Sequence, residues 1–398
     1  MMSIKKIIYI TNARLPTEKA NGYQICKMCE AFADLGIRLT LYHPYRRQPK
    51  AFKNKTVFEY YGISKNFEVV TLPNFDIIAF EKYLPKKIFP VFVFLHSYIW
   101  AKYAVNKVEK EKADIYYTRS ISVAYFLHKK KLPFILEIHT IPKGAQLKLL
   151  KKITKSKFLI RIAPLTSFMA KMLESIGFDK KKIVVLPDAV DLKLFENLPD
   201  KYECRRKLGL PKKANIIGYI GRFKAMDMEK GIYTLIEAMK YLLSKINGEP
   251  VYLLCVGGPM DMVPEYMEKA KKLGVAQERL LFYDRVPNYK VPFWIKACDI
   301  VTIPFSKNEH MSYFTSPMKV FEYMATGVPI VASDLPSLRE VLEEEKDCLF
   351  FEPEKGKSLA EQLLKLLTDN TLKSTIVRNL SLKVNRYTWT ERAKKILF

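Results

Sequence analysis

Residues 315–332 read TSPMKVFEYMATGVPIVA, a short helical stretch followed by an apolar run of strand length. Ser316 is a good N-cap for this helix, and Pro317 suits its first turn. Gly327 fits the end of the helix, because glycine tolerates the left-handed backbone conformation that occurs there. A helix that leads directly into a buried strand is the repeating unit of parallel α/β sheets.

The same alternation extends along the chain in both directions. Strand-like apolar runs occupy residues 6–11, 38–42, 68–72, 115–117, 134–139, 158–163 and 183–186 in the first half, and 216–220, 251–256, 280–283, 300–303, 329–332 and 349–351 in the second. Helical patterns separate them, for example at 23–35, 231–243 and 357–367. This order predicts the α/β class, with two parallel sheets that carry helices on both faces.

The length of 398 residues suits two domains. The segment 187–210 separates the two series of strands and is rich in Pro, Asp and Lys. We place the hinge within it, at residues 188–193.

The chain is strongly and unevenly basic. Its formal net charge is +26, and residues 1–190 hold 34 Lys and Arg against 14 Asp and Glu. The asymmetry indicates an anionic partner for the first half: membrane headgroups, a phosphorylated acceptor or nucleic acid. A basic surface without a specific partner is the alternative. No zinc finger, KH loop or aromatic RNA-binding motif occurs, so we do not expect a nucleic-acid partner.

The six cysteines do not form a disulfide framework. Cys26 and Cys29 form a CxxC inside the helical pattern 23–35, whereas redox CxxC motifs open a helix. We expect two small buried side chains on one helix face. No second CxxC or paired His completes a zinc site.

The first ten residues, MMSIKKIIYI, predict a first strand rather than a secretory signal. Residues 88–101 carry no charge, but this stretch is too short to span a bilayer. It either lies on a membrane surface or forms a buried helix that covers the sheet. We expect a cytoplasmic protein, peripheral to the inner face of the cell membrane.

Two segments of the second half predict a phosphate site. The helix after Ser316 directs its free N–H groups and its positive dipole end at whatever lies beyond it, and phosphate is the usual occupant of such a position. Lys319 and Glu322, three residues apart, share one face of this helix. A lysine can neutralise a phosphate, and a carboxylate can accept hydrogen bonds from a ribose diol. The alternative is an ordinary capped helix with a solvated Lys–Glu pair.

The second segment follows the strand 216–220. Gly221 permits a close backbone approach to a ligand, Arg222 offers a bidentate fork and Lys230 adds a cation at a helix start. Two cations at one strand-to-helix turn resemble a diphosphate clamp, although no Walker motif is present. Surface ion pairs with Asp227 or Glu229 are the alternative.

These segments resemble the donor-domain signatures of glycosyltransferase family 4, which has the GT-B fold. The similar stretches are 221–223 with 230–238, 316–334, the interdomain segment 186–191, the closing helix 387–393 and the loop 16–24. The resemblance covers nearly the whole chain. It implies two Rossmann-like domains that face each other across a cleft: an acceptor-side domain at 1–188, a nucleotide-sugar donor domain at 189–378, and a C-terminal helix at 379–398 that crosses back to the first domain.

The resemblance also implies a role for each matching residue. Arg222 and Lys230 would hold the donor diphosphate, and Glu322 would bind the donor ribose. The backbone amides around Lys319 and Val320, at the helix that Ser316 caps, would meet the phosphates. In the first domain, Gly22 would leave room for the diphosphate, and His139 would orient the sugar or stabilise transition-state charge.

The implied activity is sugar transfer from a nucleotide-diphosphate sugar, with retention of anomeric configuration, without a metal and without a cofactor other than the donor substrate. The acceptor would be lipid-linked or a cell-surface glycan. The absence of any Asp-x-Asp in the chain agrees with a metal-free site. A nucleotide-sugar epimerase of the same fold is one alternative, but it needs acid/base groups in the cleft and only His139 is well placed for that. A basic nucleic-acid-binding protein is the other.

Two departures from the family pattern concern the sugar end of the site and the diphosphate clamp. Phe314 occupies the position where the family often has a Glu near the sugar ring, and Glu309 or His310 would have to substitute. The eight-residue spacing between Arg222 and Lys230 is longer than usual.

Overall fold

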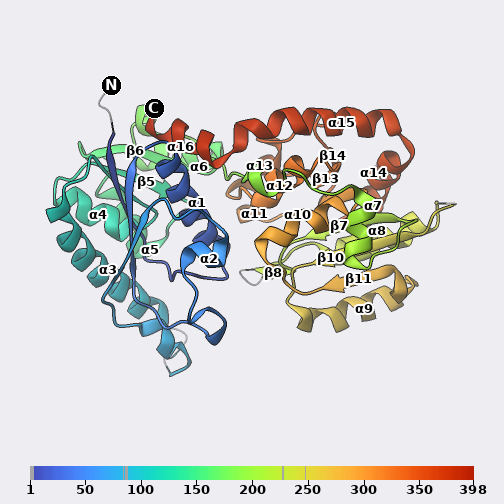
Figure 1. The fold of residues 1–398 in the computed structure, drawn as a ribbon, viewed down its shortest axis with the longest axis horizontal. Coiled ribbons are helices and arrows are strands. Elements are labelled where there is room, and N and C mark those ends of the chain that lie inside the picture. Colours follow the sequence, from blue (N-terminus) through green and yellow to red (C-terminus); the bar gives the residue numbers. More distant parts are fainter. Residues whose placement is uncertain (1–3, 84, 86–87, 226–227, 247) are drawn as a thin grey trace. The chain divides into compact units, whose positions relative to one another are not determined.

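The computed structural model describes residues 4–83, 85, 88–225, 228–246 and 248–398. The chain divides into two compact units, each built around its own sheet (Figure 1). Unit 1 comprises residues 1–187 and 389–398, and unit 2 comprises residues 188–388. The last helix therefore belongs to the first unit, whereas residues 379–388 belong to the second.

Unit 1 contains a six-stranded parallel sheet with the order β3-β2-β1-β4-β5-β6. Ile8 of β1 lies beside Thr40 of β2 on one side and Tyr116 of β4 on the other. Residues 7–10 are fully buried, because helices cover both faces of the sheet. The strands are β1 (Lys6–Ile10), β2 (Arg38–Pro44), β3 (Glu68–Leu72), β4 (Ile115–Thr118), β5 (Phe134–Ile138) and β6 (Leu159–Pro164).

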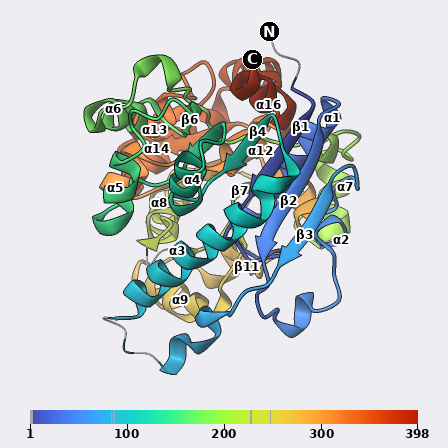
Figure 2. The same cartoon turned by 90° about the vertical axis from the view of Figure 1, so that its left-hand side faces the viewer.

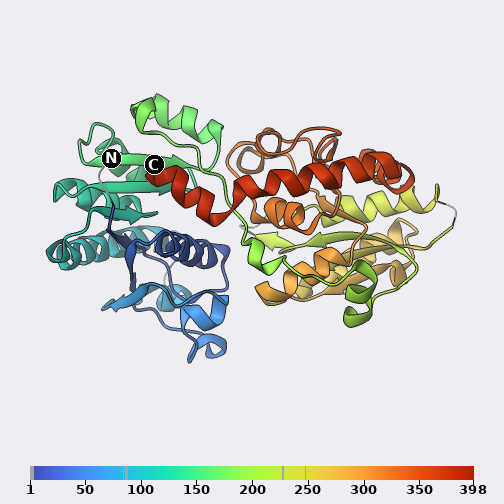
Figure 3. The ribbon, with the colours of Figure 1, turned by 45° about the horizontal axis from the view of Figure 1, so that its top comes forward.

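The helices of unit 1 include the chain's last helix, α16 (Trp389–Leu397), which lies beside α1 (Ala20–Asp34) (Figures 1 and 3). Trp389, Ala393 and Ile396 recur at helical spacing along α16 and are buried. The remaining helices are α2 (Val57–Tyr61), α3 (Phe89–Val108), α4 (Ile121–Lys129), α5 (Gly144–Lys151) and α6 (Ser167–Ile176).

Unit 2 contains a second six-stranded parallel sheet, with the order β11-β10-β7-β12-β13-β14, and a short hairpin. The strands are β7 (Asn215–Ile220), β10 (Val251–Val256), β11 (Leu280–Tyr283), β12 (Ile300–Ile303), β13 (Ile330–Ser333) and β14 (Leu349–Phe351), with β8 (Lys224–Ala225) and β9 (Met228–Glu229) in the hairpin. The helices are α7 (Lys201–Leu208), α8 (Ile232–Leu243), α9 (Val263–Lys272), α10 (Val291–Lys296), α11 (Glu309–Tyr313), α12 (Met318–Thr326), α13 (Pro336–Arg339), α14 (Gly356–Thr368) and α15 (Asn370–Lys383).

The predicted α/β class with two parallel sheets is confirmed. The predicted strand at 183–186 is wrong, because this segment forms only one bridge, from Ile183 to Ile162. The amides of Val184 and Leu186 do donate to carbonyls of β6, but the next amide in this alternation, that of Asp188, donates to the Ser316 hydroxyl instead. Cys26 and Cys29 are buried on α1 as predicted, and burial raises the pKa of both thiols.

The strand order locates the ligand end of each unit. In both sheets the chain first builds outward in one direction and then returns to the other side of the first strand. The order reverses between β1 and β4 in unit 1, and between β7 and β12 in unit 2. Doubly wound sheets bind ligands at the carboxyl ends of the strands beside such a reversal.

A buried ion pair fixes the opposite end of β7 and β12. Asp299, directly before β12, accepts hydrogen bonds at 2.5 Å from the guanidinium of Arg205 and at 2.7 Å from the amide of Ile216. Lys201 donates to its other oxygen at 2.5 Å. Asp299 and Arg205 are both buried, so removing the negative charge leaves a guanidinium without a counter-charge.

We therefore expect Asp299→Asn to lower the free energy of unfolding by about 3–5 kcal/mol, measured by urea denaturation. Asp334→Asn is the matched control, because Asp334 pairs with Arg339 on the surface and such pairs contribute less than about 1 kcal/mol. Equal losses for the two variants would contradict a structural role for the buried pair.

Candidate functional site

Lys319 lies in the first turn of α12, close to the carboxyl end of β7. Its ammonium nitrogen lies 3.7 Å from the ring centroid of Tyr219 and 5.4 Å from that of Phe305. Gly221 allows this position, since a Cβ there would lie 2.6 Å from the same nitrogen. Burial lowers the pKa of Lys319 to about 7.

Lys230 is the second cation at this place. Its side chain is buried, and its ammonium nitrogen lies 5.7 Å from the ring centroid of Phe305 and 3.9 Å from the sulfur of Met311. Burial lowers the pKa of Lys230 as well, and its charge contributes to the lowered pKa of Lys319. Two ammonium groups thus converge on one aromatic ring, and within the described part of the chain no carboxylate forms an ion pair with either.

Glu229 forms no ion pair with these cations among the described contacts, although its charge opposes the lowering of the Lys230 pKa. Its carboxylate accepts the amide N–H groups of Gly231 and Ile232, both at 2.7 Å, at the start of α8, and the hydroxyl of Tyr266 at 3.2 Å. The alternative of a surface ion pair with Glu229 is therefore wrong. Asp227, the other alternative partner, lies outside the described residues.

Arg222 follows Gly221 and is exposed. Its guanidinium makes no hydrogen bond or ion pair with any side chain that the structure describes. The structure therefore brings Lys230 and Lys319 together. It leaves Arg222 exposed at the surface, directly after Gly221.

Glu322 lies one turn after Lys319 and is half-buried. Burial raises its pKa to about 7; Lys319 acts against this rise, and Asp188 adds to it. The two side chains sense each other electrostatically, but no ion pair joins them among the described contacts. The alternative of a solvated Lys–Glu pair is wrong.

Ser316 does not cap the helix, contrary to the sequence prediction. The helix begins at Met318 with Pro317 as its N-cap, and the Ser316 hydroxyl instead accepts the amide N–H of Asp188 at 2.9 Å. The Val320 amide donates to the Pro317 carbonyl at 3.0 Å and is therefore already used. The amide of Lys319 donates to none of the described groups.

Several residues of this site were not predicted from the sequence. The rings of Tyr219 and Phe305 confine the ammonium groups, and Gly231 adopts a φ of +90° where a Cβ would strike the Pro304 carbonyl oxygen. Gly257 lies against the backbone of Gly221 at the end of the neighbouring strand. The pair Gly257-Gly258 directly after a strand was the signal that could have indicated this close approach.

Phe314 follows α11 and is half-buried. Glu309 is exposed, whereas His310 is half-buried and has a pKa lowered by burial and then by the charge of Lys230. Of the two residues considered as substitutes for the missing Glu, only His310 lies within electrostatic reach of Lys230. No cluster of three or more His, Cys, Asp or Glu side chains suited to a metal ion occurs among the described residues.

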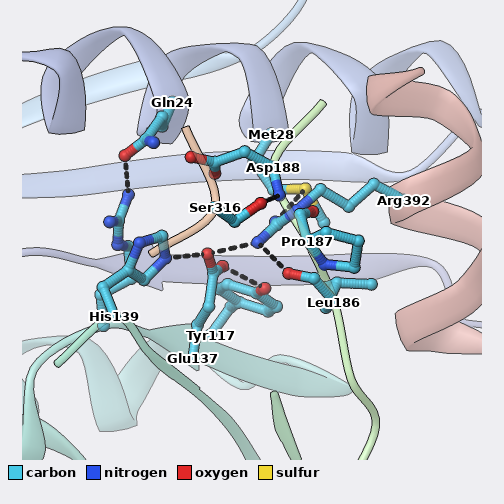
Figure 4. A network of polar contacts seen from close by, with 11 residues as sticks. Gln24, Met28, Tyr117, Glu137, His139, Leu186, Pro187, Asp188, Ser316 and Arg392 are labelled. Carbon is cyan, nitrogen blue, oxygen red and sulfur yellow. Dashed lines mark hydrogen bonds and ion pairs between the residues drawn. The ribbon is translucent and has the colours of Figure 1, made fainter. Parts of the chain in front are cut away.

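His139 in unit 1 lies at the carboxyl end of β5 and belongs to a buried network (Figure 4). Its Nε2 contacts a carboxylate oxygen of Glu137. Glu137 also accepts hydrogen bonds at 2.6 Å from the guanidinium of Arg392 and from the hydroxyl of Tyr117. Arg392 comes from α16, so the closing helix of the chain fixes the carboxylate that orients His139.

Burial within this network keeps the His139 ring neutral, against the charge of Glu137. Burial, followed by the positive charge of Arg119, lowers the pKa of His139 to about 4. Burial alone would raise the pKa of Glu137, but Arg392 and His139 outweigh it and hold that pKa well below its usual range. A neutral ring bonded to Glu137 through Nε2–H leaves Nδ1 as a hydrogen-bond acceptor, which favours orientation of a hydroxyl over stabilisation of charge.

Gly22 lies in the first turn of α1 and is buried. A Cβ at this position would collide with the hydroxyl of Tyr61 and the methyl group of Thr17. The Tyr61 hydroxyl is held there by the amide and the carbonyl of Thr17, at 2.8 and 2.9 Å. Packing within unit 1 therefore requires glycine at this position whether or not a ligand approaches.

The chain matches known structures over almost its whole length. HepE of Anabaena, solved in complex with UDP, superposes with a TM-score of 0.71 at 18% identity and covers 98% of both chains. The fold is that of the GT-B glycosyltransferases. Residues 214–369, within unit 2, match the family model described as glycosyl transferases group 1.

Curated relatives show weaker but extended similarity. A D-inositol 3-phosphate glycosyltransferase of Corynebacterium urealyticum is 28% identical over 229 residues, which are 56% of this chain and 52% of the relative. A putative teichuronic acid biosynthesis glycosyltransferase of Bacillus subtilis, TuaC, is 26% identical over 242 residues, or 58% and 54% of the two chains. The chain spans about half the length of the curated relatives it matches.

The network around Glu137 gives a prediction for the titration of His139. In Arg392→Met the Glu137 carboxylate loses its strongest counter-charge. Protonation of His139 then supplies a positive charge in its place. We expect the pKa of His139 to rise from about 4 toward its ordinary value, as measured by NMR of ¹⁵N-labelled histidine side chains.

Arg161→Met is the matched control for this experiment. Arg161 also binds α16, through the carbonyls of Lys395 and Ile396 at 2.9 and 3.0 Å, but it makes no contact with Glu137. Arg161→Met should leave the pKa of His139 unchanged. Arg392→Lys should keep that pKa close to its value in the wild type. An unchanged titration in folded Arg392→Met protein would contradict the network.

Proposed function

We propose that the chain is a retaining, metal-independent glycosyltransferase of family 4, which moves a sugar from a nucleotide-diphosphate sugar to an acceptor. The observation that carries the proposal is the pair of ammonium groups of Lys230 and Lys319 over the ring of Phe305, beside the reversal of strand order in unit 2. Neither has a described carboxylate partner, and a diphosphate supplies the missing negative charge.

The chemistry of this site suits a nucleoside diphosphate as the leaving group. When the bond between sugar and phosphate breaks, negative charge develops on the diphosphate, and pre-positioned cations stabilise that charge as it forms. Lys230 and Lys319 are poised for this role, and Arg222 adds a third cation from the adjacent loop. The amide of Lys319 and the dipole of α12 favour the same anion. Cations of the chain thus supply the charge that a bound metal ion supplies in other transferases.

The remaining polar groups of the site would bind the sugar and the ribose of the donor. Glu322, with a pKa raised to about 7, is placed to bind the ribose hydroxyls. His139 and Gly22 of unit 1 are assigned by family resemblance to the sugar and the diphosphate, and the neutral ring of His139 accepts a hydrogen bond from a sugar hydroxyl. The solved complexes of HepE with UDP and with UDP-glucose support a uridine nucleotide among the donors to be tested.

The acceptor in this proposal is anionic or lipid-linked. Residues 1–190 carry most of the net positive charge, and the Corynebacterium relative is named for a phosphorylated inositol. Electrostatic attraction to anionic lipid on the cytoplasmic face of the membrane accounts for the same charge.

Loss of either buried lysine should weaken nucleotide binding. We expect Lys230→Met and Lys319→Met each to lower the affinity for the preferred nucleotide by roughly 10- to 100-fold, the effect of losing one charge-assisted contact. The measurement is isothermal titration calorimetry, after a thermal-shift screen of UDP, GDP and ADP. Lys240→Met, on the exposed face of α8, is the matched control. Unaltered affinity in both buried-lysine variants would overturn the site.

Arg222 is tested through turnover rather than binding. Release of the nucleoside diphosphate from its sugar donor should fall by roughly 10²–10³ in Arg222→Ala, the usual effect of losing one group that stabilises transition-state charge. Incubation with donor alone separates transfer from epimerisation, because an epimerase converts the donor without acceptor. A near-normal rate would remove Arg222 from the mechanism.

A further inference from the structure

Helix α3 has two apolar faces, of which unit 1 covers only one. Its C-terminal half packs into the unit through Trp100, Ala101, Ala104, Val105 and Val108. On the opposite side a second row of large apolar side chains is exposed. We call this row the apolar stripe; it consists of Ile88, Val91, Phe92, Leu95, Ile99 and Tyr103.

The spacing of the apolar stripe shows that it is one surface rather than scattered residues. Apart from the adjacent pair Val91 and Phe92, its members follow one another at intervals of three or four, so they lie along one side of the helix over about four turns. Figure 2 shows α3 at the front of the view, with no other helix of unit 1 over its outer side. Phe75, Ile78 and Tyr83, from the segment that leads into α3, are exposed as well. Contiguous apolar surface of this kind marks a binding site for another molecule.

The charges around the stripe identify the chemistry of that molecule. Helix α3 contains no acidic residue, and Lys102, Lys107 and Lys110 are exposed along and just beyond its C-terminal half. Lys130 of the neighbouring helix α4 lies at the same end, where it pairs with Glu109 at 3.0 Å. The surface is therefore apolar at one end and basic at the other, which complements the acyl chains and the anionic headgroups of a bilayer.

A membrane-spanning role does not suit this helix, because one of its faces packs into unit 1. None of the helices that the structure describes is long and apolar enough to cross a bilayer. The apolar stripe extends for roughly 22 Å along the axis, at about 1.5 Å per residue, against a hydrocarbon core of about 30 Å. A helix of this kind lies in the interface, with its apolar side chains inserted below the headgroups.

We propose that the apolar stripe of α3, with the lysines at its C-terminal end, docks unit 1 onto an anionic lipid bilayer. The site is separate from the nucleotide site in unit 2 and does not depend on the proposed reaction. It would hold the chain at the surface where a lipid-linked acceptor resides.

Vesicle flotation of the full chain tests the proposal without any donor. The protein should float with phosphatidylcholine vesicles that contain phosphatidylglycerol, and recovery should fall with rising salt. Val91→Glu combined with Ile99→Glu should lower the partition coefficient at least about tenfold, because two exposed anchors become charged. Leu382→Glu is the matched control, since Leu382 on α15 is 68% exposed against 67% for Ile99.

A site-specific probe shows which surface inserts. All six native cysteines are buried, so a single Ile99→Cys or Leu382→Cys variant can be labelled with an environment-sensitive dye. The dye at position 99 should shift to the blue on anionic vesicles, whereas the dye at position 382 should not.

Three results would overturn the proposal. One is equal recovery on neutral and anionic vesicles, which removes the electrostatic part. Another is full vesicle binding by the folded double-Glu variant, which places the contact elsewhere. The third is a dimer in sedimentation that the double-Glu substitution dissociates, without vesicle binding by the wild type, which makes the stripe an interface between copies of the chain.

Discussion

Two lysine ammonium groups that share one aromatic ring, with no carboxylate ion-paired to either among the described residues, are the constraint on which the site in unit 2 depends. Lys230 and Lys319 approach the same ring of Phe305, and burial lowers the pKa of both. The arrangement is unfavourable without a ligand, because each charge loses solvation and gains a like-charged neighbour. The fold maintains it through backbone features, above all the glycines at positions 221 and 231, whose missing side chains leave space for Lys319 and for the end of β12.

In unit 1, by contrast, the buried carboxylate has a charged partner. Glu137 is paired with Arg392 and hydrogen-bonded to Tyr117, and the neutral ring of His139 completes the set. The Glu137 carboxylate thus has its counter-charge in Arg392, so the network suits a rigid hydrogen-bonding surface rather than an anion site. The proposed roles differ accordingly, with charge stabilisation in unit 2 and orientation in unit 1. Arg392, from α16, is the residue that neutralises Glu137.

The sequence predicted the alternation of strands and helices well, because buried parallel strands read as short apolar runs between turn residues. It also located the turn that holds Gly221 and Lys230 and the helix that holds Lys319. It failed where a long-range contact overrides local preference: Ser316 has the chemistry of an N-cap but binds the amide of Asp188, 128 residues away. The rings of Tyr219 and Phe305 and the helix-capping role of Glu229 have no local signature. The segment 88–101 gave two opposed hypotheses, and the structure shows a helix with one buried and one exposed apolar face.

Proton uptake on nucleotide binding tests the central claim most directly. At pH 8 the Lys319 ammonium, with its pKa lowered to about 7, has mostly lost its proton, whereas Glu322 is mostly ionised. A bound diphosphate raises the pKa of Lys319, so calorimetry in two buffers of different ionisation enthalpy should detect uptake of about one proton per nucleoside diphosphate at pH 8 and little at pH 6. Lys319→Arg should bind without uptake. Binding with no proton exchange at pH 8, or the same uptake in Lys319→Arg, would contradict the account.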